Sequence, residues 1–64
     1  MTGEELHRIR QRLGLTQAQL AERLGVHWNS VARWERNEMS IRETAARLAR
    51  LLVKMEGTRK RGRR

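Results

Sequence analysis

The stretch Gln17–Glu35 reads QAQLAERLGVHWNSVARWE, and it decides the fold. Its first half places Leu20, Ala21 and Leu24 at the i, i+1 and i+4 spacing that gives a helix one apolar face. Gly25 follows directly, and a glycine just past the last apolar position is a common helix C-cap. The first half therefore predicts a short helix that ends in a tight turn.

The second half of the stretch predicts another short helix, which begins near His27. Val31 and Trp34 lie three residues apart, so they can face Leu20 and Leu24 across the turn. The opposite, solvent-facing side is predicted to carry Trp28, Asn29, Ala32, Arg33 and Arg36. An aromatic ring, an amide, a methyl group and guanidinium groups are suited to base edges in a DNA groove.

Positions across much of the chain together carry a family resemblance. They are Arg10, the LGLTQAQLAERLGV run from Leu13 to Val26, Val31, Trp34 and Glu35. From about Leu6 to Leu52 the chain resembles the phage-repressor and Cro class of bacterial helix-turn-helix regulators, also called the xenobiotic-response-element class. One such fragment alone is weak, but the set is specific. The resemblance implies an all-α, compact domain of four helices, or five, that binds duplex DNA.

The composition narrows the class of protein. The 64 residues correspond to one small domain, and the absence of cysteine excludes disulfides and thiolate metal sites. With two histidines and no ligand cluster, we expect no metal and no cofactor. No Ser-His-acid or Cys-His set and no phosphate-binding glycine loop occurs, so we expect no enzyme. Without a membrane-length apolar run or an apolar signal core, we expect a cytoplasmic protein, nucleoid-associated when bound.

The charge is high and unevenly distributed. A formal net charge of +8 and a pI of about 11.8 favour a polyanionic partner, with nucleic acid first. Residues 58–64 hold five of these positive charges, which leaves +3 for residues 1–57. We expect a helix-turn-helix domain over residues 1–57 and a disordered basic tail over 58–64. The tail is either an arm along phosphates or the minor groove, or a solubilising end.

Three capping-box patterns predict where helices begin. Thr2 to Glu5 opens a helix that runs to about Leu13, and Thr16 to Gln19 opens one at Gln17. Ser40 to Glu43 opens the last helix, whose core stripe is predicted to be Ile41, Ala45, Leu48, Leu52 and Met55. Leu51 and Val53 lie off this stripe, so a second copy of the chain could cover them.

Four residues are candidates for contacts with DNA phosphates, and they are Thr16, Gln17, Arg10 and Arg42. Free backbone N–H groups at the start of a helix attract anions, and the resemblance implies the phosphate role for Gln17. The alternative for Thr16 and Gln17 is that they form a capping segment alone. The alternative for Arg42 is an ordinary solvated arginine. The resemblance also implies a structural ion pair between Arg10 and Glu35.

Five residues are candidates for base readout, and they are His27, Trp28, Asn29, Arg33 and Arg36. His27 departs from the family pattern, which usually has Ser or Thr as the helix N-cap at this position. Imidazole is a weaker N-cap than these hydroxyl side chains. It either contacts phosphate or base, or is simply exposed. Trp28 either meets sugar or a thymine methyl, or folds back over the preceding helix.

These observations predict a sequence-specific regulator of transcription that binds double-stranded DNA. The simplest form is a repressor that binds a palindromic operator as a homodimer, because one helix reads too few base pairs. The alternative is an antitoxin or adaptor of the same fold, whose main partner is another protein such as a toxin. A third possibility is RNA binding through the basic tail.

Overall fold

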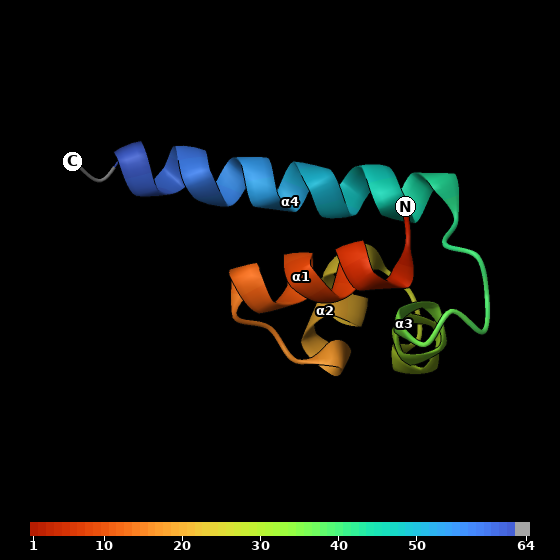
Figure 1. The fold of residues 1–64 in the computed structure, drawn as a ribbon. Helices are drawn as coiled ribbons and strands as arrows, with labels where there is room; N and C mark the ends of the chain where they lie inside the picture. The colour runs from red at the N-terminus through yellow and green to blue at the C-terminus, as the bar shows by residue number, and fades with distance from the viewer. Residues whose placement is uncertain (63–64) are drawn as a thin grey trace.

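A computed structural model describes the backbone of residues 1–62 and the side chains of residues 1–56 (Figure 1). The described residues form four α-helices and no strand. The helices are α1 (Gly3–Leu13), α2 (Gln17–Leu24), α3 (Trp28–Glu35) and α4 (Glu43–Gly62). The predicted all-α fold is thereby confirmed. No helix in this part of the chain has the length and apolar character needed to cross a membrane.

The predicted capping boxes of α1 and α2 are both present. The Thr2 hydroxyl accepts a hydrogen bond from the Glu5 backbone N–H at 3.1 Å, and the Glu5 carboxylate accepts one from the Thr2 N–H at 2.9 Å. The same pair of bonds links Thr16 and Gln19, at 3.1 and 2.9 Å. Each helix then ends at a glycine in the left-handed region, where φ is 69° and 72°. Local sequence therefore sets both ends of these two helices.

The core lies where the helices meet. Leu6, Leu20, Val31 and Trp34 are its largest fully buried side chains, one or two from each of α1, α2 and α3. From α4 the core receives mainly small side chains, and those that are buried are Ala45, Ala46 and Ala49. In Figure 1, α1 lies along α4, and α3 is seen nearly end-on. The axis of α3 thus runs across the direction of α4.

The start of α4 corrects the third predicted capping box. The helix begins at Glu43 and not after Ser40, and the Ala46 N–H donates its helical hydrogen bond to the Arg42 carbonyl at 2.9 Å. Ile41 lies in the non-helical connection and packs against the core from there. Because Ile41 packs on the core from the connection, the chain becomes helical only at Glu43, and Ser40 remains outside the helix.

The core stripe predicted for α4 is also partly wrong. Ile41 lies outside the helix, and the Met55 side chain is 52% exposed. Leu48 and Leu52 are half-buried at the edge of the core, while the alanines fill its centre. The reason is geometric, because α4 is longer than α1 and its far end extends past the other helices (Figure 1).

The backbone of α4 continues through Gly62, beyond Gly57, where the sequence predicts the end of the domain. This differs from the disordered tail predicted for residues 58–64. A glycine within a helix costs about 1 kcal/mol relative to alanine, and the arginines and lysine that follow are good helix formers. The side chains of residues 57–64 and the backbone of residues 63–64 lie outside the described part of the chain. The division into domain and tail stays a prediction.

The N-terminus of α1 packs closely on the C-terminus of α3. A Cβ atom at Gly3 would lie 2.8 Å from the Glu35 carbonyl oxygen and closer still to that of Trp34. The Gly3 N–H also donates a hydrogen bond to Asn37 Oδ1 at 3.2 Å. Asn37 itself adopts a positive φ of 62°, a conformation that asparagine tolerates better than most residues. The close contact fixes the end of α3 from which the connection to α4 departs.

Candidate nucleic-acid interface

The two sides of α3 differ sharply in burial. Val31, Ala32 and Trp34 are buried against the rest of the domain, whereas Asn29 and Arg33 are exposed. The prediction that Ala32 faces solvent is wrong, since only 7% of the residue is exposed. A face with amide and guanidinium groups remains free to enter a groove.

Trp28 is the largest exposed side chain at the start of α3. Its exposed fraction is 52%, so about half of its surface is open to solvent. Its ring centroid lies 5.8 Å from that of His27, with 31° between the ring planes. The two aromatic rings therefore stand together at the N-terminal end of α3.

His27 is the N-cap of α3. Its Nδ1 accepts a hydrogen bond from the Asn29 backbone N–H at 3.2 Å, and the residue remains exposed. An imidazole thus replaces the hydroxyl or carboxylate that usually satisfies this free N–H group. His27 is therefore both exposed and structural, and its contact with phosphate or base stays a prediction.

The other end of α3 is held by a polar cluster around Glu35. Arg10 donates from Nε to Glu35 Oε2 at 2.7 Å and from Nη2 to Oε1 at 3.2 Å. Gln17 donates from Nε2 to Oε1 at 3.1 Å, and His7 Nδ1 lies 3.2 Å from the same oxygen. The Glu35 side chain is 7% exposed and that of Arg10 17%. We call Arg10, Glu35, Gln17 and His7 the Glu35 cluster.

The electrostatics of this cluster favour a charged carboxylate. Burial alone would raise the pKa of Glu35, but hydrogen bonds from Arg10, Gln17 and His7 and the charge of Arg10 lower it below its ordinary value. Glu35 is consequently ionised at neutral pH. Its negative charge joins α1, the start of α2 and the end of α3 at one point.

Two members of the cluster were not predicted from sequence. His7 has its Nδ1 3.1 Å from Arg10 Nη2 as well as near Glu35, and Gln17 was expected to contact phosphate. One signal existed for His7, because it lies three residues before Arg10 on the same helix face. No local signal connects Gln17 with Glu35.

The predicted phosphate-contact residues are not all equally available. Thr16 and Arg42 are exposed, and Thr16 also caps α2. All three guanidinium nitrogens of Arg10 are engaged within the protein, since Nη1 donates to the Leu15 carbonyl at 3.1 Å. One N–H of Nη1 is then left for phosphate, so Arg10 is first a structural residue. The phosphate contacts themselves stay predictions.

Arg36 stands apart from the other predicted base readers. It is the C-cap of α3, and its Nε lies 3.3 Å from the carboxylate of Glu38, with both side chains largely exposed. Such an exposed ion pair contributes little to the stability of the fold, and it breaks readily. The structure thus brings Trp28, Asn29 and Arg33 together on α3 and leaves Arg36 beyond its end.

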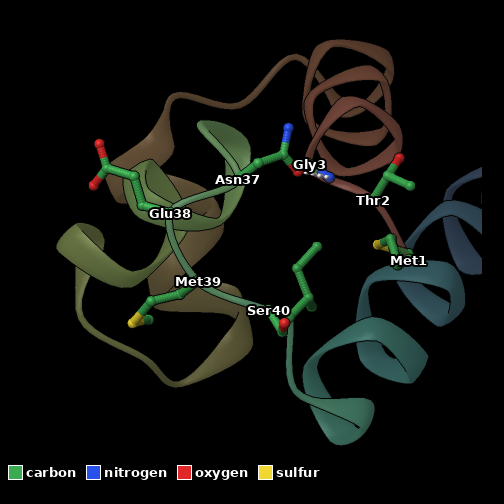
Figure 2. A pocket seen from close by; sticks show the side chains of 8 residues that line it. Met1, Thr2, Gly3, Asn37, Glu38, Met39 and Ser40 are labelled. Atoms are coloured by element: carbon green, nitrogen blue, oxygen red, sulfur yellow. Dashed lines mark hydrogen bonds between the residues drawn. The ribbon is translucent and has the colours of Figure 1, made fainter.

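A surface hollow of about 440 Å³ lies beside the connection between α3 and α4. It is lined by residues 1–3 and 37–41, and Figure 2 shows the Gly3 to Asn37 hydrogen bond at its edge. None of the predicted DNA-contact residues lines it. The described residues also contain no group of three His, Cys, Asp or Glu side chains that could hold a metal ion.

Comparison with known proteins agrees with this geometry. A family model described as helix-turn-helix matches residues 6–52, which include α1 from Leu6 onward, all of α2 and α3, and the first half of α4. Neither the curated proteins nor the solved structures that were compared give a match. The matched part contains the tight turn at Gly25 and the exposed face of α3. The chain belongs to the helix-turn-helix family, as a DNA-binding regulatory domain of the Cro and phage-repressor type.

Proposed function

We propose that the protein is a sequence-specific transcriptional regulator that reads duplex DNA with α3 in the major groove. The simplest mode is repression, in which a homodimer occupies a palindromic operator and excludes the polymerase. Two α3 helices about 34 Å apart would read half-sites one helical turn apart. The proposal places the protein in the cytoplasm, on the nucleoid when bound.

One observation carries the proposal. α3 is fixed by buried Val31 and Trp34 and by the Glu35 cluster, while Asn29 and Arg33 on it remain exposed. A rigid helix with free amide and guanidinium groups is preorganised for hydrogen bonds to base edges. Asn29 suits adenine and Arg33 suits guanine, because each can form two parallel hydrogen bonds.

The test is selection of bound sites from a random duplex library at about physiological salt. We expect the wild type to enrich a palindrome. Arg33→Ala should lose one guanine preference in each half-site, because a bidentate pair contributes about 1 to 3 kcal/mol of discrimination. Arg50→Ala is the matched control, since it removes another exposed arginine, on α4.

Two results would contradict the proposal. If Arg33→Ala keeps the wild-type motif, α3 is not the reading element. If the wild type enriches no motif at all, its DNA affinity is electrostatic and sequence-independent. RNA binding would instead appear as equal affinity for duplex DNA and structured RNA, with no requirement for Arg33.

A protein partner is the second candidate, and one observation favours it. Leu51 and Met55 on α4 are 47% and 52% exposed and lie four residues apart on one helix face. An antitoxin or adaptor would use such an apolar surface for its partner. Co-purification of a toxin or other protein that is lost in Leu51→Glu would favour this candidate over an operator-binding homodimer.

A further inference from the structure

The cap of α3 determines which nitrogen of His27 carries the proton. A backbone N–H can only donate, so the Nδ1 that accepts from Asn29 must present its lone pair. A neutral imidazole with a lone pair on Nδ1 has its hydrogen on Nε2. The capping bond therefore selects the Nε2–H tautomer of His27.

This proton-bearing nitrogen is available for an external partner. His27 is exposed, and Nε2 forms no hydrogen bond within the described residues. The ring cannot rotate freely, because the capping bond holds Nδ1 and the Trp28 ring lies 5.8 Å away. Both constraints reduce the entropy that a later hydrogen bond would cost.

The Nε2–H donor lies next to the exposed residues of α3 that are predicted to contact bases. His27 directly precedes Trp28 and caps onto Asn29, both of which are exposed. Serine or asparagine would cap the helix at least as well as imidazole does. The cap alone therefore does not require a histidine, whereas an outward donor beyond the reach of a serine hydroxyl does.

We propose that His27 is a fixed hydrogen-bond donor to DNA, through Nε2–H, and that its cap of α3 sets this polarity. The inference rests on the proposed function and deepens it. The acceptor on the DNA is either a phosphate oxygen or a base-edge acceptor, which means guanine N7 or O6, adenine N7 or thymine O4. The cytosine amino group offers no acceptor, so a cytosine at that position is disfavoured.

The first test needs no DNA. Two-bond proton–nitrogen correlation spectra of the free protein distinguish the two imidazole nitrogens by their protonation. We expect the proton of neutral His27 on Nε2, whereas His7 serves as an internal reference with a different environment. A proton on Nδ1 of His27 would overturn the proposal, whatever the protein binds.

The second test separates the cap from the donor. His27→Ser keeps a good cap and removes the outward N–H, so the thermal midpoint should stay level or rise while DNA affinity falls about 3- to 10-fold. His27→Phe keeps an aromatic ring beside Trp28 but loses both cap and donor, so stability and affinity should both fall. Gln11→Ser, an exposed position on α1, is the control and should leave affinity unchanged.

The selected duplex and a scrambled duplex then distinguish the two acceptors. A loss of equal size on both indicates a phosphate oxygen, and a loss confined to the selected duplex indicates a base edge. Wild-type affinity of His27→Ser for both duplexes would overturn the proposal. A wild type that prefers no sequence would contradict the proposed function instead, and the scrambled duplex would still report on the phosphate contact.

Discussion

Arg10 donates a hydrogen bond from Nε to Glu35 Oε2 at 2.7 Å, and this contact joins the last turn of α1 to the last residue of α3. The pair lies 25 positions apart in sequence, and both side chains are largely removed from solvent. It orients the end of α3 because a largely buried carboxylate has few other acceptable partners. The orientation of the reading helix thus depends on a contact that does not touch DNA bases.

A double-mutant cycle should measure this coupling. We expect Arg10→Ala and Glu35→Ala each to lower the free energy of unfolding by about 3 kcal/mol, because each leaves a buried charge without its partner. The double variant should lose less than the sum of the two, by about 1 kcal/mol or more. Urea denaturation gives the values. Arg8→Ala, which breaks the exposed Arg8 to Glu4 pair, is the control and should cost under about 1 kcal/mol.

Acid should remove the contribution of Glu35 to stability. Its folded-state pKa lies below the ordinary value of 4.5, so the contribution is complete above that value and is lost as pH falls through the folded-state pKa. We therefore expect the difference in unfolding free energy between wild type and Glu35→Gln to be constant near neutrality and to narrow below about pH 4.5. Thr2 also lowers the pKa of Glu5 by a backbone hydrogen bond, but both proteins retain Glu5. A difference that widens with acid would contradict the assignment.

Replacing Gly3 should disturb the junction of α1 and α3. The new methyl group of Gly3→Ala would overlap the Trp34 carbonyl, so the helices must separate, at a cost of about 1 to 3 kcal/mol. Gly14→Ala provides the comparison, because φ there is 69° but no atom lies within 4 Å of the new methyl group. It should show backbone strain alone, of about 1 kcal/mol. Thermal unfolding that ranks Gly3→Ala as the milder change would refute the close contact.

Self-association should depend on the exposed flank of α4. We expect Leu51→Glu to weaken the dimer and leave the monomer folded, because the side chain is already 47% exposed. Light scattering reports the mass, and circular dichroism the fold. Met39→Glu, at an exposed apolar residue in the connection before α4, serves as the control. If Leu51→Glu remains dimeric, the dimer forms through another surface.

The basic C-terminal residues should contribute affinity without sequence preference. Deletion of residues 58–64 removes five positive charges, so affinity should fall for all duplexes alike and the salt dependence should flatten, by up to about 4.5 in log–log slope. Because the backbone of α4 extends to Gly62, a second variant should keep the length and replace the five basic residues by glutamine. Loss of preference for one sequence in either variant would place base readout in this segment.

Much of the fold could be predicted because its determinants are local. Capping residues act within one turn of helix. The structure has the predicted capping boxes at Thr2 and Thr16 and the predicted glycine C-caps at positions 14 and 25. The spacing of Leu20, Val31 and Trp34 likewise identifies the core faces without any knowledge of the partner helix. The exposed Asn29 and Arg33 follow from the same periodicity.

The tertiary structure decided what depends on distances between helices. Ser40 carries the pattern of a cap but does not cap, because the path from α3 to α4 holds Ile41 on the core and delays the helix to Glu43. The resemblance to the phage-repressor class implied that Glu35 pairs with Arg10, and the structure contains that pair. Only packing could bring His7 and Gln17 to the same carboxylate, because a buried charge recruits whatever donors the assembled helices place within about 3 Å.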